Sequence, residues 1–278
     1  MCISNEKVYV VSGQGIFTYD LADKSIETLS KVNKLSDLDA RSISYSQKHN
    51  AVIIGYSTGN IDLIINNQVI NIPDIKRTAI QGFKSINEIY INEDFAFLST
   101  GFGIVKLDIQ RQEIKETFLI GDNGTNVFIN DLTFFQDTIY AATNKGVYFA
   151  PQNGSNLSDF QNWEKLNSFS ESSINQIESN NSRLLLNISS DAYNADTIIS
   201  YDGNTWSEFL FEGYDNKDVK NINYDGEKWL ICYKYNGIII NNSNEIESNI
   251  YAYNFETSMT IQPRKIIKGH GDEYWISD

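Results

Sequence analysis

The side chains best suited to acid–base or metal chemistry in this sequence are two histidines, and they are far apart. His49 and His270 both fall in predicted turns, so the sequence offers no metal triad and no catalytic base of the usual kind. Asp20 and Asp108 each open a predicted hairpin, but neither is followed by enough spaced carboxylates for a calcium loop. The simpler interpretation is turn initiation for the aspartates and solvated turns for the histidines. We therefore expect no enzymatic activity, no metal ion and no cofactor.

A short basic stretch lies on a predicted connection between two repeats. Lys76 and Arg77 follow Asp74, with Lys84 nearby, and together they form a positive spot in an acidic protein. A solvated loop explains them without a ligand, but such loops carry binding sites in many folds. A second connection holds the turn Gly121-Asp122-Asn123-Gly124, which opens no helix and so is no phosphate cradle. The candidate ligand-binding residues are Lys76, Arg77, Lys84, Asp122 and Asn123.

One motif resembles a turn known from sialidase-type propellers. The segment from Ser200 to Trp206 is similar to a shortened Asp-box, whose simpler interpretation is a hairpin turn with a buried tryptophan. Sialidase chemistry would need an arginine cluster facing the axis. The five arginines show no blade position common to them all: Arg41, Arg77, Arg111, Arg183 and Arg264. We therefore reject a sialidase.

Composition indicates a folded, acidic chain. Hydrophobic residues make up 41% and aromatic residues 13% of the 278 residues, which supplies a packed core. The 22 basic and 36 acidic residues give a net charge of −14, which argues against nucleic acid as a partner because phosphate-backbone binding needs a positive surface. No run of 18 apolar residues occurs, so we expect no transmembrane helix. Cys232 lies inside an apolar run, far from Cys2, and we expect a buried free thiol there.

The elements that must position these residues come from a repeat. One motif recurs seven times, with successive centres 44, 44, 43, 45, 44 and 46 residues apart: Tyr9, Ile53, Phe97, Tyr140, Leu185, Trp229 and Trp275. That spacing is typical of propeller blades. The clearest copy, residues 85–125, alternates with period two and predicts a four-stranded meander. The sequence therefore predicts an all-β fold, a β-propeller of four-stranded antiparallel blades.

The ends of the chain leave the number of blades open. Seven second strands are expected, but only six full first strands and six third and fourth strands. We favour about seven blades with incomplete closure. The alternative is six blades, closed if residues 261–268 pair beside residues 7–11 and leave 274–278 as an overhang. Propellers normally close by sharing strands from both termini in one blade, and the uneven strand count here does not fit such a closure. We therefore expect residues 1–278 to be a single propeller domain cut from a longer multidomain protein.

Several segments contain residues that a generic propeller blade does not require. Gly-Asn-Ile-Asp-Leu-Ile at 59–64, Ile-Pro-Asp-Ile-Lys-Arg at 72–77, Ser-Thr-Gly-Phe-Gly-Ile-Val at 99–105 and Ile-Gly-Asp-Asn-Gly at 120–124 resemble the N-terminal propeller of PorZ-like proteins. These proteins are accessory components of the type IX secretion system in Bacteroidetes. The resemblance is strongest over residues 7–150. Such blades are also similar to the sensor propellers of hybrid two-component regulators.

The resemblance implies an exported protein in the periplasm or at the outer-membrane surface. It implies an attachment complex in which a sortase-like partner transfers cargo to anionic lipopolysaccharide. It also implies further domains, a second propeller and a C-terminal β-sandwich, and it carries over no catalytic residue.

These observations favour a non-catalytic scaffold that docks protein components of a type IX secretion and cell-surface attachment complex. Anionic lipopolysaccharide or another glycan is a further candidate ligand, with Lys76, Arg77 and Lys84 as the local basic spot. The alternative is a periplasmic propeller that senses a glycan within a hybrid two-component regulator. That alternative predicts sugar-stacking aromatic side chains among the 16 tyrosines and 4 tryptophans, whereas core packing is the simpler explanation for most of them.

Overall fold

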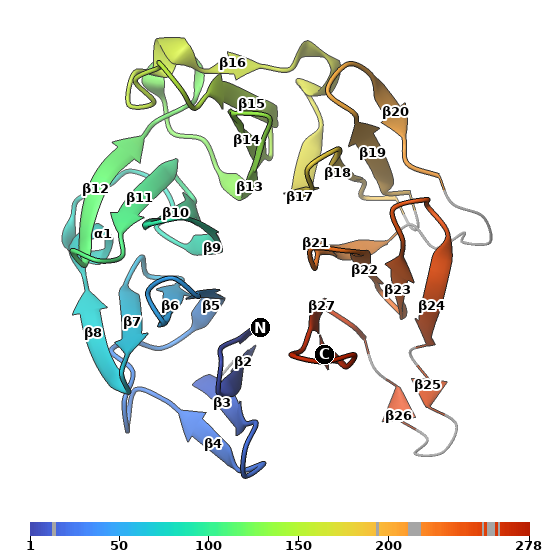
Figure 1. The fold of residues 1–278 in the computed structure, drawn as a ribbon. Coiled ribbons are helices and arrows are strands. Elements are labelled where there is room, and N and C mark those ends of the chain that lie inside the picture. The colour runs from blue at the N-terminus through green and yellow to red at the C-terminus, as the bar shows by residue number, and fades with distance from the viewer. Residues whose placement is uncertain (13–14, 193–194, 211–217, 252, 255–258, 261) are drawn as a thin grey trace. The chain divides into compact units, whose positions relative to one another are not determined.

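The repeated motif forms four-stranded antiparallel sheets, as the alternation predicts. The computed structural model describes residues 1–278 except 13–14, 193–194, 211–217, 252, 255–258 and 261. Among the described residues six sheets have four strands, and within each sheet the strands pair in sequence order (Figure 1). The β-propeller class with four-stranded antiparallel blades is confirmed. The chain divides into two compact units, residues 1–132 with 148–165 (unit 1) and residues 133–147 with 166–278 (unit 2).

Unit 1 contains three complete sheets. The first comprises β1 (Cys2–Ile3), β2 (Lys7–Ser12), β3 (Gly15–Asp20) and β4 (Ile26–Leu29). The second comprises β5 (Ala40–Ser46), β6 (Ala51–Tyr56), β7 (Ile61–Ile65) and β8 (Gln68–Ile72). The third comprises β9 (Ile86–Asn92), β10 (Phe95–Thr100), β11 (Ile104–Asp108) and β12 (Glu113–Phe118). The connections of this unit hold the one-turn helix α1 (Asp74–Arg77) and the short 3-10 turns η1 (Asp122–Gly124) and η2 (Phe160–Asn162).

The remaining strands continue the pattern. The fourth sheet comprises β13 (Ile129–Phe135), β14 (Thr138–Thr143), β15 (Gly146–Pro151) and β16 (Glu164–Lys165). After η3 (Asn167–Phe169), the fifth comprises β17 (Ser173–Ser179), β18 (Leu184–Ser189), β19 (Thr197–Tyr201) and β20 (Trp206–Glu208). The sixth comprises β21 (Val219–Tyr224), β22 (Trp229–Tyr233), β23 (Asn236–Ile240) and β24 (Ile246–Tyr251). Two pairs follow: β25 (Tyr253–Asn254) with β26 (Met259–Thr260), and β27 (Lys265–Lys268) with β28 (Tyr274–Ser277).

The described residues therefore form six complete blades, which is the alternative considered from the sequence, rather than the seven favoured there. The seventh copy of the motif forms only the pair β27–β28 among the described residues. In the closure considered above, residues 261–268 would pair beside residues 7–11, and residue 261 lies outside the described part of the chain. Instead, β2 has β1 and β3 as its neighbours, and β27 pairs with β28. The first strand of the first copy is present, shortened to Cys2–Ile3.

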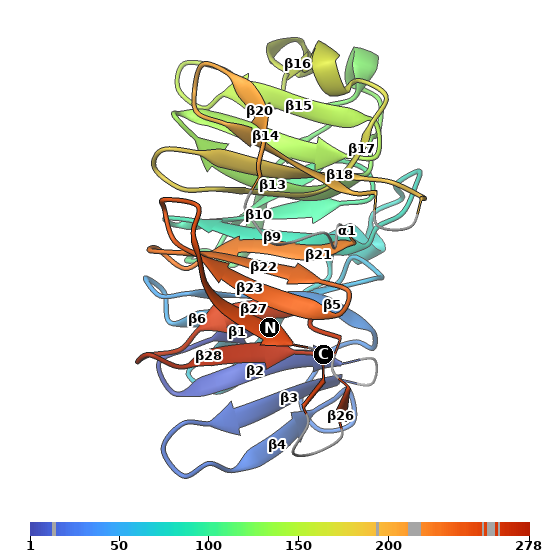
Figure 2. The ribbon, with the colours of Figure 1, turned by 90° about the vertical axis from the view of Figure 1, so that its right-hand side faces the viewer.

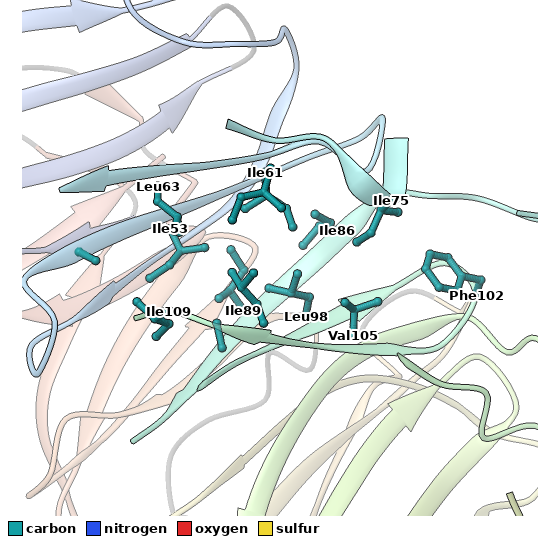
Figure 3. Close-up of a cluster of buried hydrophobic side chains, with 14 residues drawn as sticks. Ile53, Ile61, Leu63, Ile75, Ile86, Ile89, Leu98, Phe102, Val105 and Ile109 are labelled. Carbon is teal, nitrogen blue, oxygen red and sulfur yellow. The ribbon is translucent and has the colours of Figure 1, made fainter. Parts of the chain in front are cut away.

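Apolar side chains between the second and third sheets form a continuous core. Figure 3 shows this cluster, in which Ile53 and Leu63 from one sheet lie with Ile89 and Leu98 from the next. All six residues of β6 are buried, because a strand in the middle of a sheet that is covered on both faces has no solvent side. Burial of this kind explains why these strands appear as apolar runs rather than as simple alternation.

The first strand of a sheet carries a β-bulge in each of four described sheets. The extra residue lies two positions before an isoleucine of that strand (Ile43, Ile89, Ile177 or Ile222), and the four extra residues are Arg41, Asn87, Asn175 and Lys220. A bulge leaves one residue without an opposite partner and redirects its side chain. Arg264 stands two positions before Ile266, so two of the five arginines, Arg41 and Arg264, do share one position in the repeat.

Candidate functional site

The connection that carries Lys76 and Arg77 is a one-turn helix anchored by a single apolar residue. Pro73 follows β8 and cannot extend the ladder, and Arg77 donates its backbone N–H to the Pro73 carbonyl at 2.9 Å. Ile75 is 3% exposed and belongs to the core between the second and third sheets, whereas Lys76 and Arg77 are exposed. The sequence Asp-Ile-Lys-Arg therefore presents its apolar residue inward and its cations outward.

Lys76 does not point at an open site, because its ammonium group pairs with Asp37. The Asp37 side chain is only 7% exposed, and it also accepts hydrogen bonds from Thr58 Oγ1 at 2.7 Å and from the backbone N–H of Leu38 at 2.9 Å. Burial alone would raise the pKa of Asp37, but the hydrogen bonds from Lys76, Thr58 and Leu38 outweigh it and lower this pKa below its ordinary value. Lys76 thus ties α1 to the connection between the first two sheets.

The other predicted ligand-binding residues lie on the same connection and on the one after β12. Lys84 donates from Nζ to the backbone carbonyl of Lys76 at 2.8 Å, so these two residues do come together. Asp122 accepts from the hydroxyl of Tyr148 at 3.3 Å, and Asn123 adopts φ 57°, a left-handed conformation that asparagine tolerates well. Arg77 makes no ion pair with any described residue and stays in solvent.

A groove lies between these two connections, and none of the five predicted residues lines it. Its volume is about 650 Å³, and α1 lies next to β12 at this point (Figure 1). The lining residues come from the connection after β8, from β12 and from the loops beside it: Asp74, Ile75, Thr78, Ala79, Ile80, Gln81, Phe102, Ile114, Thr117, Leu119 and Asn126. We call this feature the β12 groove. More than half of its lining side chains are apolar, and Asp74 carries the one formal charge among them.

A bulge in β12 builds one wall of the β12 groove. With a strict period of two, Ile114 and Thr117 would face opposite sides of the sheet. The register of β12 against β11 shifts so that Ile114 lies opposite Leu107 and Thr117 opposite Val105. Leu107 and Val105 both belong to the core toward the second sheet, so the shift turns both wall residues to that side.

The floor of the β12 groove is the end of the same core. Figure 3 shows Phe102 and Ile75 together at one end of the cluster. Phe102 is 2% exposed, whereas Leu119 at the rim is 38% exposed. The opposite wall is held by Asn126, whose side-chain amide donates to the Gln81 carbonyl. A groove with a packed floor and braced walls can receive an extended apolar segment without first unfolding.

The backbone at Gly101 lies close to the backbone of residues 83–85, beside the β12 groove. The backbone N–H of Gly101 donates to the Ser85 carbonyl at 3.1 Å, and a Cβ atom on Gly101 would clash with the carbonyl oxygen of Phe83. Glycine is required here because no side chain fits between the two segments. Phe83 itself is 73% exposed and meets Phe128 edge to face at 6.4 Å between ring centroids.

A buried polar network supports the same part of unit 1, and sequence reasoning did not identify it. Asp62 on β7 is 0% exposed and accepts from Tyr56 Oη at 2.7 Å, from the Ser36 N–H at 2.8 Å and from Asn71 Nδ2 at 2.9 Å. Burial, followed by the hydrogen bond to Asp62, raises the pKa of Tyr56. A charged residue inside the apolar run Ile61-Asp62-Leu63 was the available signal, because an aspartate is almost never fully buried unless it is paired.

The side chains for which the sequence predicts no catalytic role do not form one cluster in the described part of the chain. Among the described residues, no three His, Cys, Asp or Glu side chains lie close enough to hold a metal ion. His49 is not simply solvated: its Nε2 lies 2.9 Å from Asp94 Oδ1 and its side chain is 15% exposed. Cys232 is a buried free thiol, as the sequence predicts, and burial raises its pKa to about 12. Within the described chain, no helix is long and apolar enough to cross a membrane.

The tryptophans divide between core and surface. Trp163 and Trp229 are buried, at 7% and 1% exposure, which fits core packing. Trp206, expected to be buried in the Asp-box-like hairpin, is instead half-buried and stacks on Tyr201 with 4.4 Å between ring centroids. The hairpin itself is present, since the Asp202 carboxylate accepts from the backbone of Asn204 and Thr205.

The described sheets and the β12 groove define a β-propeller domain with an apolar surface groove. A family model described as the N-terminal β-propeller domain of PorZ, of the type IX secretion system, matches residues 8–164, more than half of the chain. The chain belongs to this family of type IX secretion components. No curated protein sequence matches it at a significant level.

Solved structures agree with the fold. PorZ from Porphyromonas gingivalis, described as an essential bacterial surface component of the type IX secretion system, has a TM-score of 0.78 and 17% identity. That comparison covers 99% of this chain and 34% of the PorZ chain, so this chain spans about a third of that structure. Hydrazine synthase from Kuenenia stuttgartiensis has a TM-score of 0.68 at 9% identity, covering 96% of this chain and 88% of that chain. The extracellular domain of a one-component system from B. thetaiotaomicron has a TM-score of 0.52 at 13% identity, covering 100% and 44%.

Proposed function

We propose that this domain is a non-catalytic scaffold that docks a protein component of the type IX secretion system, through an extended segment of that partner lying in the β12 groove. The observation that carries the proposal is the groove itself: about 650 Å³, with an apolar floor at Phe102 and a partly exposed apolar rim at Leu119. A pocket of this size and character is suited to apolar side chains of a ligand.

The position of β12 in its sheet supports an extended occupant. β12 is the end strand of the order β12-β11-β10-β9, so one of its edges has no strand neighbour in that sheet. Peptides commonly add to such an edge through main-chain hydrogen bonds, while neighbouring pockets select alternate side chains. Asp74 at the groove favours a lysine or arginine in the docked segment.

The biological setting of the proposal rests on the family. We propose an exported protein at the cell surface in which residues 1–278 form a single propeller domain of a longer multidomain chain. A sortase-like protein of the attachment complex is the partner that fits this setting. Lys76 and Lys84 are engaged in contacts within the domain, so Arg77 is the most accessible member of the basic spot for an anionic glycan.

The test is co-purification from the natural host with the full-length protein. Leu119→Asp places a charge at the groove rim, and we expect it to reduce recovery of type IX components by about tenfold or more, because burying one leucine contributes about 1.5–3 kcal/mol. Ile26→Asp is the matched control, since Ile26 is 70% exposed on β4 of another sheet.

Two outcomes would contradict the docking proposal. One is equal recovery of the same components with Leu119→Asp and with the control. The other is calorimetric binding of a glycan to the domain that Leu119→Asp leaves intact while no type IX protein co-purifies with either form, which would favour a glycan sensor.

A further inference from the structure

A second pocket lies in unit 2, and positively charged side chains line it. Its volume is about 310 Å³ and its lining residues are Lys220, Lys234, Gln262 and Arg264. Three of these four side chains carry a positive charge, in a chain whose net charge is −14. We call it the basic pocket. Acidic residues outnumber basic residues by 36 to 22, so three cations around one hollow stand out against the overall charge.

The blade repeat explains why two of the cations meet. Val219 pairs with Tyr233 and Asn221 pairs with Cys232, so Lys220 is the extra residue of the bulge in β21. Arg264 takes the equivalent position before β27, one blade period of 44 residues later. β21 and β27 pack against each other, as Figure 1 shows, and Figure 2 shows β27 in the same stack of strands as β22 and β23. Equivalent positions on adjacent first strands therefore place Lys220 and Arg264 at the same pocket.

In two other described copies of the motif, a neutral residue takes this position. Asn87 and Asn175 occupy the bulge in β9 and β17. Asn87 uses its side-chain amide to donate to the Ile129 carbonyl at 2.7 Å, a structural contact within unit 1. A neutral amide is therefore sufficient for the structural contact at this bulge. The cations at the same position in the basic pocket are not explained by that contact.

The cations of the basic pocket differ in their local contacts. Lys220 pairs with Asp218, and Lys234 Nζ lies 5.2 Å from the ring centroid of Tyr235. Arg264 is exposed; its backbone N–H donates to the Ser277 carbonyl at 2.8 Å, and no described acidic side chain pairs with its guanidinium group. The backbone N–H of Gln262 donates to Asp278 Oδ1 at 2.8 Å, a carboxylate beside the pocket.

We infer that the basic pocket binds a multivalent oxyanion group, a phosphate or a cluster of carboxylates. A guanidinium group offers a planar fork of donors that matches either anion, and the two ammonium groups add point charges around it. A volume of about 310 Å³ accommodates a small anionic group rather than a long segment. This site is in unit 2 and is independent of the β12 groove, so either proposal can fail without the other.

The test is calorimetric titration of the 278-residue chain with inorganic phosphate and, separately, with citrate, at constant ionic strength. We expect saturable 1:1 binding of at least one of them, which also distinguishes phosphate from carboxylate recognition. Arg264→Gln and Lys220→Gln should each weaken binding by about tenfold, because a hydrogen bond to a charged group contributes about 1.5–3 kcal/mol. Lys145→Gln removes the same charge from an exposed turn of unit 2 and should leave binding unchanged.

A second measurement on the unchanged protein guards against a folding defect in the variants. The bound anion should protect Lys220 and Lys234 from acetylation, read by mass spectrometry, and should leave Lys145 as reactive as before. The inference is overturned if neither anion saturates. It is equally overturned if all three variants weaken binding to the same extent, or if protection is uniform over the surface lysines.

Discussion

The contact between Lys76 and Asp37 gives the sharpest test of how the β12 groove is held in place. Lys76→Met keeps most of the side-chain length but removes the cation from a carboxylate that is 7% exposed. Asp37 then retains its hydrogen bonds from Thr58 and from the Leu38 N–H, and a longer contact of 3.9 Å to Lys31. The carboxylate becomes only partly compensated in a buried position.

The expected cost follows from the burial of the two partners. Breaking a fully buried ion pair costs about 3–5 kcal/mol, whereas an exposed pair contributes about 0–1 kcal/mol. Asp37 is buried, but the Lys76 side chain is 40% exposed and solvent screens it, so the pair lies between these limits. We expect Lys76→Met to lower the free energy of unfolding by about 1–2 kcal/mol at neutral pH.

The pH dependence has a definite sign. Because the folded-state pKa of Asp37 is lowered, its contribution to stability is present above the unfolded value of about 3.9 and is lost as the pH falls through the folded pKa. Without Lys76 the burial of Asp37 remains, so its pKa rises. The deficit of the variant should be full near neutral pH and should shrink as the pH falls into the acid range, since a protonated Asp37 needs no cation.

Urea unfolding of the wild type and the variant over this pH range measures the effect. Arg77→Met is the matched control, because Arg77 stands next to Lys76 on α1 with no acidic partner among the described residues, and it should change stability by less than about 0.5 kcal/mol. Equal destabilisation by the two substitutions, or a deficit that does not change with pH, would refute the assignment of Lys76 to Asp37.

Three further predictions concern the supporting structure. Gly101→Ala should destabilise unit 1 by about 1–3 kcal/mol, because its Cβ meets the backbone carbonyl of Phe83; an unchanged urea midpoint would contradict this. Tyr56→Phe removes the 2.7 Å hydrogen bond to buried Asp62 and should cost about 1–3 kcal/mol in thermal or urea unfolding, whereas a neutral result would mean that another donor replaces it. Cys232, with its pKa raised to about 12 and no exposed surface, should resist a thiol reagent at about pH 8 until urea unfolds the protein; rapid labelling in the native state would contradict its burial.

The fold could be predicted from the sequence because its signal is local and repeated. Period-two alternation or a short apolar run identifies the strands, and the spacing of about 44 residues identifies the blades. The number of complete blades was harder to predict, because it depends on the short strands at the ends of the chain. The first strand of the first sheet is reduced to Cys2–Ile3, and two residues carry no periodicity.

The candidate site could be predicted only in part, because its contacts join distant segments. The sequence located the connection that holds Lys76 and Lys84, but the carboxylate that pairs with Lys76 lies 39 residues earlier. The β12 groove combines side chains from the connection after β8 with Ile114 and Thr117, whose common orientation depends on a bulge. A strict alternation rule assigns those two residues to opposite faces, so the groove is visible only in three dimensions.

Site-specific photo-crosslinking tests the central claim most directly. A photoreactive residue at position 119 of the full-length protein, in the natural host, should crosslink to a type IX secretion component, whereas the same residue at position 26 on β4 should not. Both sites carry exposed apolar side chains, Leu119 at 38% and Ile26 at 70%, so exposure alone cannot produce the difference. A component that still co-purifies with the protein, but crosslinks at position 26 and not at position 119, would contradict docking in the β12 groove.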